Sequence, residues 1–215
     1  MQIHHLGAEN TVLNQFTSEL RNAKIQKDRL RFRRNVERIG EIMAYEISKT
    51  FDYSAKDVET PLGIANCSTP DNNVVLSTIL RAGLPLHRGF LNFYDNAENA
   101  FVSAYRKYVS ETDFKIHIEY IASPRIDNKT LIIVDPMLAT GGSMELAYQA
   151  LMTKGKPAHL HMAAIISSRE ALRHLERRMP EKAELWVATI DEEMNDHYYI
   201  VPGLGDAGDL AYGEK

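Results

Sequence analysis

The segment from residue 131 to residue 143 constrains the fold of this 215-residue chain more than any other. Residues 131–134 are four consecutive aliphatic residues, which predicts a short strand covered on both faces. Asp135 follows this run directly, and after four more residues a small-residue turn at 140–143 opens a helical pattern. A buried strand, a loop and a helix in this order are typical of α/β proteins with a parallel sheet.

The rest of the chain repeats this alternation. Short apolar runs predict further strands at residues 74–80, 101–105, 115–121, 162–166 and 185–190. Helical patterns are found at residues 85–93, 143–154 and 168–179. The run at 115–121 alternates apolar and polar residues, which predicts a half-exposed strand in a hairpin arm. We therefore predict an α/β fold: a mostly parallel twisted sheet with helices on both faces.

The segments before and after these alternating strands and helices have different patterns. Apolar residues recur at three- and four-residue steps along residues 30–47, with Asp28 as a candidate cap, so we expect a long helix within a helical segment at 12–50. A polar stretch at 52–71 follows it, and residues 198–215 contain the glycine- and aspartate-rich pattern of a loop. The length fits a single domain that spans the whole chain.

Composition limits the classes of function. The apolar content of 44% allows a buried core, and no apolar run is long enough to cross a bilayer. The N-terminus lacks the pattern of a secretion signal, and a single cysteine, Cys67, excludes an internal disulfide. The net charge of −4 argues against a nucleic-acid-binding surface. We expect a soluble cytoplasmic protein with neither a membrane nor a nucleic acid as its partner.

The turn at 140–143 has the composition of a phosphate site. Its glycines let backbone N–H groups approach a phosphate, and the N-terminus of the following helix attracts negative charge. The hydroxyls of Thr140 and Ser143 can donate to phosphate oxygens, and Asp135 stands at the edge where open α/β sheets bind ligands. The patterns of the ATP P-loop and of the dinucleotide fingerprint are absent. A turn without a ligand is the weaker alternative, because the strand and Asp135 precede it.

This combination resembles the 5-phosphoribosyl 1-pyrophosphate (PRPP) motif of type I phosphoribosyltransferases. In that family the acidic end holds the ribose and the turn holds the 5′-phosphate. Most members carry two adjacent acids, whereas Pro136 fills the second position here, a form typical of uracil phosphoribosyltransferases. By this resemblance the PRPP-binding residues of the motif are Asp135, Pro136, Met137, Leu138, Ala139, Thr140, Gly141, Gly142 and Ser143.

Further segments resemble the same family in the same order. Residues 81–84 read Arg-Ala-Gly-Leu after a predicted strand, and the guanidinium of Arg81 can bind a pyrophosphate in a bidentate way. Arg106 matches the loop arginine that reaches the pyrophosphate. Residues 199–209 match the uracil-binding loop almost residue for residue. The resemblance implies that uracil is bound by Tyr199, Ile200, Gly205, Asp206 and Ala207.

The resemblance implies transfer of the phosphoribosyl group of PRPP to uracil, with UMP and pyrophosphate as products. The catalytic residues would be Arg81, Arg106, Asp135 and Asp206, and these arginines and Asp206 would also contact PRPP. Asp206 would orient the base or help its N1 proton to leave. Mg²⁺ would be the cofactor, held mainly through PRPP rather than by metal-binding side chains. Activation by GTP and a homodimer or larger homo-oligomer are also implied.

Two departures from the family pattern keep alternatives open. The residues after Arg106 match poorly, and Leu210 stands where a basic residue is common. The alternatives are a non-catalytic protein that senses PRPP and a pyrimidine, a purine phosphoribosyltransferase, and an inactive partner subunit. The acidic net charge argues against the first, and residues 199–209 argue against the second.

Two clusters outside these motifs have ordinary explanations. His159 and His161 would share one face of a strand, where packing or a surface position is favoured over a metal pair. Arg31, Arg33 and Arg34 are expected on a solvated helix face or in a subunit contact.

Overall fold

The computed structural model of the chain describes residues 1–71, 73–108 and 114–214, and for residues 104–108 and 114–117 it describes the backbone alone. The helices in this part are α1 (Val12–Arg21), α2 (Arg29–Ser48), α3 (Leu84–Leu91), α4 (Gly142–Leu151), α5 (Arg169–Arg178) and α6 (Ala207–Tyr212), with the short 3-10 turns η1 (Leu6–Ala8), η2 (Ile25–Lys27) and η3 (Met152–Lys154). The strands are β1 (Gln2–His5), β2 (Tyr53–Thr60), β3 (Gly63–Pro70), β4 (Val74–Leu80), β5 (Glu98–Tyr108), β6 (Phe114–Ala122), β7 (Thr130–Val134), β8 (Met137–Leu138), β9 (His159–Ser168), β10 (Glu184–Asp191), β11 (Glu193–Met194) and β12 (Ile200–Val201).

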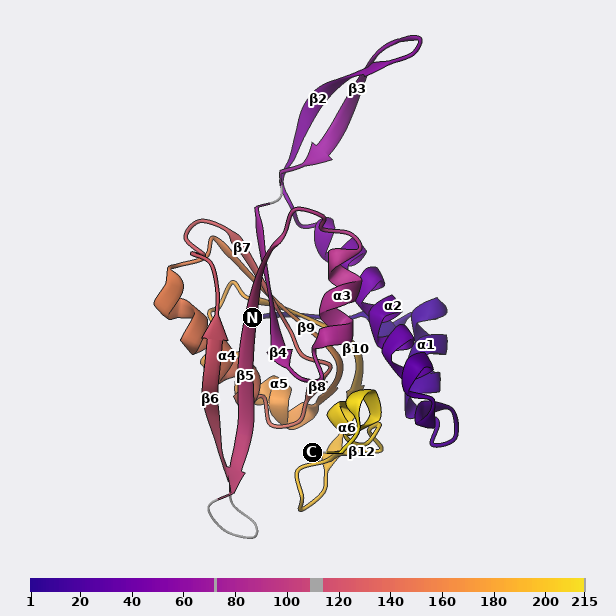
Figure 1. Ribbon diagram of the computed structural model, residues 1–215, viewed down its shortest axis with the longest axis vertical. Coiled ribbons are helices and arrows are strands. Elements are labelled where there is room, and N and C mark those ends of the chain that lie inside the picture. The colour runs from indigo at the N-terminus through magenta and orange to yellow at the C-terminus, as the bar shows by residue number, and fades with distance from the viewer. Residues whose placement is uncertain (72, 109–113, 215) are drawn as a thin grey trace.

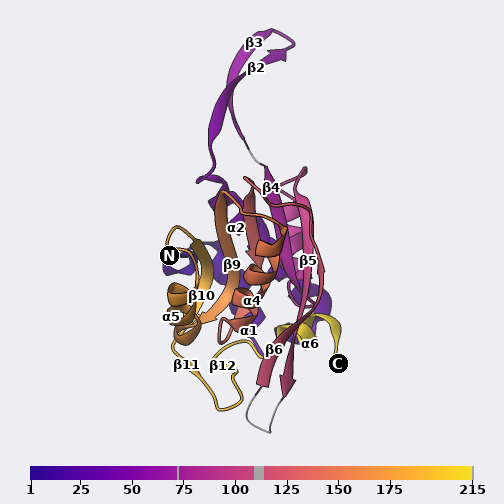
Figure 2. The same cartoon turned by 90° about the vertical axis from the view of Figure 1, so that its left-hand side faces the viewer.

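One central sheet organises the described part of the molecule. Its strand order is β1-β10-β9-β7-β4-β5-β6, with the short β8 beside β9. Neighbouring strands run parallel except β5 and β6, which form an antiparallel hairpin. Helices cover both faces of the sheet (Figure 1, Figure 2). The predicted fold class, including the hairpin arm, is therefore confirmed.

Strand β7 is buried on both faces, as its composition predicts. Along β7, Ile132 and Val134 belong to a core that they share with α1, α2 and α3. Leu131 and Ile133 belong to a second core, which they share with α4 and α5. Because β7 lies between β4 and β9 in the middle of the sheet, the residues that follow it stand at the middle of the carboxyl edge.

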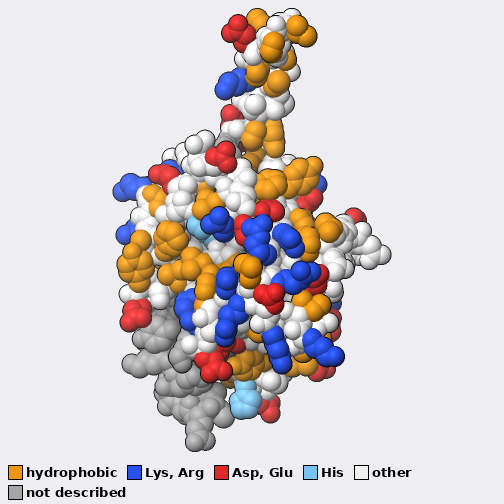
Figure 3. Space-filling view, turned by 45° about the vertical axis from the view of Figure 1, so that its right-hand side comes forward, with side chains coloured by type: hydrophobic (Ala, Val, Ile, Leu, Met, Phe, Trp, Pro, Cys, Tyr) orange, Lys and Arg blue, Asp and Glu red, His pale blue; other side chains and the backbone are white. Residues whose placement is uncertain are grey.

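The polar stretch at 52–71 forms a second hairpin, which the sequence pattern did not predict. Strands β2 and β3 pair in an antiparallel register from Tyr53 with Pro70 to Thr60 with Gly63. The hairpin projects from the end of the molecule opposite the carboxyl edge (Figure 1). Apolar side chains stand at its tip (Figure 3), where Leu62 is 100% and Ile64 is 76% exposed. Because no residue of β2 or β3 is buried, the hairpin lacks the alternation of buried apolar and exposed polar side chains that marks a half-buried strand.

The C-terminal tail is less of a loop than its composition predicts. Residues 207–212 form the short helix α6, and the Asp206 carboxylate caps it by accepting the N–H groups of Gly208 and Asp209 at 2.8 and 3.0 Å. The expectation of a loop throughout residues 198–215 was therefore wrong. The sequence pattern did not predict this helix because glycine and aspartate are typical of loops. The Asp206 cap defines where the helix starts.

Other predicted elements are confirmed, with shifted ends. The strand at 74–80 and the long helix capped by Asp28 are present, and Ser168 caps α5. Strands β5 and β9 are longer than their apolar cores predict, because each continues into polar residues. Among the described helices, none combines the length and the apolar character needed to cross a membrane.

Candidate active site

The predicted phosphate turn lies between β7 and α4 at the carboxyl edge of the sheet. Gly141 is the N-cap of α4 and has a left-handed backbone, with φ of 81°. A Cβ there would also lie 3.2 Å from side-chain atoms of His174 and Leu175 on α5. The position therefore requires glycine for both its conformation and its close packing. The turn presents the N-terminus of a ten-residue helix, the geometry that binds phosphate in many α/β proteins.

Strand β9 holds the loop that leads into this turn. The Pro136 carbonyl accepts hydrogen bonds from the N–H groups of Ile165 and Ile166 at 3.1 and 3.0 Å. The Ser168 hydroxyl donates to the Ala139 carbonyl at 2.5 Å. Predicted PRPP-binding residues between Asp135 and Thr140 are thus fixed by a strand that no motif includes. This support comes from ordinary sheet packing, so the sequence pattern offered no signal for it.

Asp135 lies at the carboxyl edge of the sheet, directly after β7. It is half-buried, and its Oδ1 accepts the N–H of Met137 at 3.4 Å. Among the described residues, no three His, Cys, Asp or Glu side chains converge into a metal-binding group.

Arg81 joins the segment after β4 to helix α6 and the residue that follows it. Its Nη2 donates to the Gly213 carbonyl at 3.2 Å and lies 3.4 Å from a carboxylate oxygen of Asp209. Its Nε is buried and has no hydrogen-bond partner among the described residues, although its side chain is 37% exposed. A guanidinium with an unused donor at a ligand-binding edge is suited to bind an anion.

Gly83 explains the close packing of the same segment. A Cβ at this residue would lie 2.3 Å from the hydroxyl oxygen of Thr78 and 2.6 Å from the Ile79 carbonyl oxygen. It would also lie 3.1 Å from the carbonyl oxygen of Val134 on the neighbouring strand. The glycine thus lets the turn fold back on the ends of β4 and β7. Gly83 therefore packs against the end of β7, at the residue that precedes Asp135.

The predicted base loop combines buried anchors with an exposed edge. Ile200 and Ala207 are 3% and 4% exposed, so their side chains belong to the core and they can reach a base only with backbone groups. Tyr199 is 43% exposed, and Asp206 is exposed as well. Gly205 has a left-handed backbone, with φ of 91°. The loop can therefore present backbone donors and acceptors to a flat ligand, as expected.

A hollow of about 480 Å³ beside the phosphate turn brings in residues that the sequence argument missed. Thr140 and Gly142 line it together with Tyr198 and Arg178. Tyr198 has a left-handed backbone, with φ of 60°, which is uncommon for an aromatic residue and concentrates at functional sites. The phosphate turn and the segment before the base loop therefore share one hollow. Neither Tyr198 nor Arg178 belongs to a sequence motif, so only the fold shows that they line this hollow.

The hollow is also lined by a buried acid, Glu145, whose charge is balanced by basic residues of α5. Glu145, in the first turn of α4, accepts hydrogen bonds from Arg178 and His174, each at 2.7 Å. Burial alone would raise the pKa of Glu145, but these two partners hold it below its usual value. The carboxylate is therefore ionised and neutralised by α5, so it does not leave an unpaired negative charge beside the phosphate turn.

Arg106 lies on β5, but its side chain is outside the described residues. The same holds for residues 109–113, which form most of the atypical segment after it. The hairpin of β5 and β6 extends past the carboxyl edge toward the end of the molecule where α6 and β12 lie (Figure 1, Figure 2). The predicted role of Arg106 at the pyrophosphate stays a prediction.

The arginine cluster on α2 is engaged within the molecule. Arg31 pairs with Glu19 at 2.8 Å, Arg34 pairs with Glu37 at 2.7 Å, and Arg33 donates to a backbone carbonyl at 2.7 Å. On the face that includes α1 and α2, basic and acidic side chains are mixed (Figure 3).

Comparisons with known proteins agree with this geometry. The family model described as Uracil phosphoribosyltransferase matches residues 8–214. A uracil phosphoribosyltransferase of Porphyromonas gingivalis is 62% identical over 215 residues, which covers 100% of both chains. The solved structure of the AQ2163 protein from Aquifex aeolicus has a TM-score of 0.88 at 30% identity, and the match covers 99% of this chain and 98% of that one.

A more distant structure shares the fold alone. A hypoxanthine phosphoribosyltransferase from Staphylococcus aureus matches with a TM-score of 0.50 at 15% identity, over 74% of each chain. The family model and the identity over the whole chain carry the closer assignment, because they cover all of the motifs at the carboxyl edge. The chain therefore belongs to the uracil phosphoribosyltransferase family.

Proposed function

We propose that the protein transfers the phosphoribosyl group of PRPP to uracil and so forms UMP and pyrophosphate, a step of pyrimidine salvage. The observation that carries this proposal is the meeting of the motifs at one edge. Arg81 reaches Asp209 in helix α6 and Gly213 directly after it, and the phosphate turn follows the neighbouring strand β7. PRPP bound along this edge would lie between the phosphate turn and the base loop.

In this reaction the bond between ribose C1′ and pyrophosphate breaks, and a bond to N1 of uracil forms. Positive charge develops on the ribose, so the protein acts mainly by positioning the reactants and stabilising the leaving charge. The backbone N–H groups at 140–143 would anchor the 5′-phosphate. Asp135 would hold the ribose hydroxyls. Arg81 and Arg106 would stabilise the departing pyrophosphate.

Uracil offers two carbonyl acceptors with an N–H donor between them, and a rigid backbone edge can match that pattern. The proposed edge consists of backbone groups of Ile200 and of residues 205–207, beside the exposed Tyr199. Asp206 uses Oδ1 to cap α6, and its Oδ2 accepts no hydrogen bond from the described residues. That oxygen is available to orient the base or to accept its N1 proton.

Mg²⁺ is the proposed cofactor. It would neutralise charge on the pyrophosphate as the C1′ bond breaks. Asp135 would contribute the protein's carboxylate, directly or through water, with the other ligands supplied by PRPP and solvent. The position of Asp135 at the carboxyl edge supports this arrangement.

The test of function is nucleotide formation from single bases. Purified protein is mixed with PRPP, Mg²⁺ and uracil, cytosine, hypoxanthine or adenine, and the products are separated. We expect UMP from uracil and no nucleotide from the other bases. A purine nucleotide would mean that the base loop is wrongly assigned. No product from any base, with PRPP still bound, would favour a protein that senses PRPP.

The proposed role of Asp135 predicts a selective loss of activity. Asp135→Asn keeps the size of the side chain but removes its charge, so kcat/KM should fall by about 100-fold or more. The melting temperature should change by less than about 4 °C, since the residue is only half-buried. Asp57→Asn, on the β2–β3 hairpin, is the control and should retain activity. If Asp135→Asn unfolds the protein instead, Asp135 has a structural role.

Three finer expectations accompany the activity. A homodimer or larger homo-oligomer is proposed from the family resemblance and from the exposed apolar tip of the β2–β3 hairpin. Activation by GTP is proposed from the resemblance alone, and adding GTP to the same assay tests it. A cytoplasmic location is proposed because the family resemblance implies a salvage enzyme.

A further inference from the structure

The backbone of the base loop is held from behind by the N-terminal helical segment. Arg21, the last residue of α1, donates to the Gly203 carbonyl at 3.0 Å. Gln26, in η2, donates to the Leu204 carbonyl at 3.1 Å. These bonds join residues more than 170 positions apart, and no motif of the family resemblance includes either donor.

An ion pair with a buried acid completes this support. Arg21 contacts both carboxylate oxygens of Asp191, at 2.6 and 2.9 Å, and its Nη2 also donates to the Thr189 hydroxyl at 3.0 Å. Asp191, the last residue of β10, accepts the N–H of Gly203 at 2.8 Å. The N–H and the carbonyl of Gly203 are therefore both held by one arginine–aspartate pair.

The pair has the properties of a rigid support. Asp191 is 6% exposed. Burial alone would raise the pKa of Asp191, but the hydrogen bonds from Arg21 and from the Gly203 N–H hold it below its usual value. Asp191 is thus ionised, and every atom of the contact except Oδ1 of Asp191 takes part in more than one hydrogen bond. Separating such a buried pair is costly, so the Gly203 backbone has little freedom to move.

Gly203 controls the shape of the loop around it. Its φ of 60° is left-handed, and it lies two residues before Gly205, at the start of the segment proposed to face uracil. Backbone recognition of a small planar base fails if the loop shifts by a fraction of an ångström, because each donor and acceptor must align. A support that fixes Gly203 therefore also fixes the edge that follows it.

We propose that Arg21 and Asp191 are positioning residues for uracil, which pre-organise the base loop without touching the substrate. This inference rests on the proposed base-binding role of residues 199–209. It adds a contribution from helix α1 and the end of strand β10 to a site otherwise built from three motifs. The PRPP-binding turn is held separately by β9, so the support should affect uracil much more than PRPP, although Asp206 of the same loop is also expected to contact PRPP.

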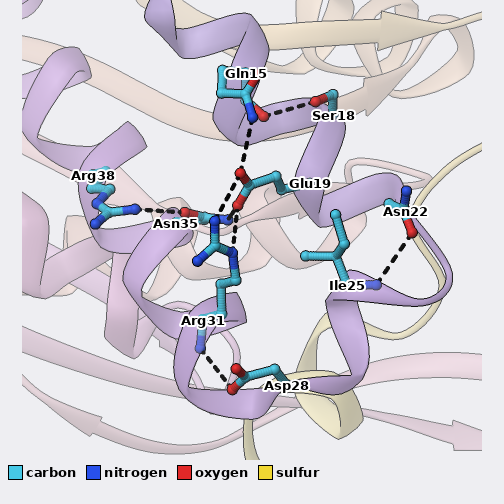
Figure 4. Close-up of polar contacts among 9 residues, drawn as sticks. All are labelled: Gln15, Ser18, Glu19, Asn22, Ile25, Asp28, Arg31, Asn35 and Arg38. Atoms are coloured by element: carbon cyan, nitrogen blue, oxygen red, sulfur yellow. Dashed lines mark hydrogen bonds and ion pairs between the residues drawn. The ribbon is translucent and has the colours of Figure 1, made fainter.

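The N-terminal segment contains a matched control for this pair. Arg31 on α2 binds both carboxylate oxygens of Glu19 on α1, at 2.8 and 3.0 Å (Figure 4). Glu19 is 8% exposed and also accepts hydrogen bonds from Asn35 and Gln15. This pair has the same chemistry and a similar burial of its acid, but its contacts lie within the N-terminal helices. It measures what a buried pair contributes to folding alone.

The experiment compares Arg21→Lys with Arg31→Lys in the steady-state assay. Lysine keeps the charge beside each carboxylate, so neither acid is left unpaired, but it cannot reach all the acceptors that the guanidinium joins. For Arg21→Lys we expect the KM for uracil to rise about tenfold and the KM for PRPP to stay within about twofold. Arg31→Lys should leave both KM values near those of the unchanged protein.

Two more variants separate the possible failures. Asp191→Asn removes the charge and should raise the KM for uracil in the same selective way as Arg21→Lys. Gly205→Ala changes the loop itself and should also raise the KM for uracil. If Gly205→Ala does so while Arg21→Lys and Asp191→Asn do not, the pair does not position the loop.

The other outcomes are equally decisive. Equal rises in both KM values for Arg21→Lys, or an equal rise for uracil in Arg31→Lys, would assign the pair a general structural role and overturn the inference. If neither Arg21→Lys nor Gly205→Ala changes the KM for uracil, the base-binding role of the loop fails, and this inference fails with it. UMP formation by the unchanged protein is measured separately, so the proposed reaction would still stand.

Discussion

His161 illustrates how burial sets the charge of a single residue. Its side chain is 2% exposed, and Nδ1 accepts a hydrogen bond from Nε1 of Trp186 at 3.3 Å. Burial lowers the pKa of His161 to about 4, with smaller contributions from His159 and His4, although Glu184 opposes the shift. The imidazole is therefore neutral at neutral pH. This agrees with the packing role favoured for the histidine pair.

This lowered pKa predicts a loss of stability in acid. The unfolded chain takes up a proton at His161 near pH 6.5, whereas the folded protein takes it up only near pH 4. Between these values the unfolded state binds more protons, so the unfolding free energy falls with the pH, by up to about 3 kcal/mol. The contribution is complete above pH 6.5. Urea unfolding of the unchanged protein and of His161→Gln between pH 7 and pH 4 measures it, as the difference between their slopes.

His159→Gln is the matched control, because His159 lies on the same strand but is exposed. It should retain most of the pH dependence of the unchanged protein, because burial is the largest cause of the lowered pKa of His161. An identical dependence in all three proteins would show that His161 does not titrate differently in the folded state.

Residues of the candidate site were predictable where they lie in one contiguous motif. Asp135 and the turn at 140–143 follow a buried strand, so their place at the carboxyl edge follows from the fold class alone. Arg21 and Tyr198 were not predictable, because they reach the site from distant parts of the chain and have no motif of their own. Asp206 was singled out for chemistry, and its capping of α6 became visible only in the structure.

At the scale of elements, the start of α4 depends on Gly141. Gly141→Ala would place a Cβ in a left-handed backbone and against α5, so we expect a loss of about 1–2 kcal/mol in unfolding free energy. The turn would also shift, and the KM for PRPP should rise more than the KM for uracil. Denaturant unfolding and steady-state kinetics together check both parts.

Gly63→Ala serves as its control. Gly63 also has a positive φ, 152°, but it lies at the turn of the β2–β3 hairpin with no atom within 4 Å of an added Cβ. It should cost stability through backbone strain without changing either KM. Kinetics of Gly141→Ala that match those of Gly63→Ala would remove the case for a phosphate turn.

Elements were predictable where burial of one or both faces produces a recognisable pattern of apolar residues in the sequence. Strand β4 has the predicted bounds, 74–80, because all but its last residue are buried. The β2–β3 hairpin was missed because no residue in it is buried, so its sequence has no core-facing side. Strand β1 was missed because four residues at the sheet edge are too few for a pattern. Helix α6 was missed because its glycine and aspartate are typical of loops.

At the scale of the whole molecule, the chain divides into a packed α/β body and a hairpin that stands away from it (Figure 1). The candidate site and the hairpin lie at opposite ends. A hairpin without buried side chains gains little stability from its own chain, since two isolated strands are marginal in water. The proposed homo-oligomer would give its apolar tip a surface to cover.

Replacing residues 53–70 with a short Gly-Ser linker tests this arrangement. The body should still unfold cooperatively, because the hairpin contributes no side chain to either core. Sedimentation should show a smaller assembly than that of the unchanged protein. The same assembly in both proteins would show that the hairpin does not mediate association, and loss of cooperative unfolding would show that the body needs it.

The projecting hairpin also carries the one thiol of the sequence, Cys67 on β3. A maleimide fluorophore would therefore label a single position without any engineered substitution. Anisotropy and quenching of such a dye would follow what the hairpin contacts, at the opposite end of the molecule from where turnover is proposed. The protein has its own spectroscopic handle for watching assembly and catalysis in the same sample.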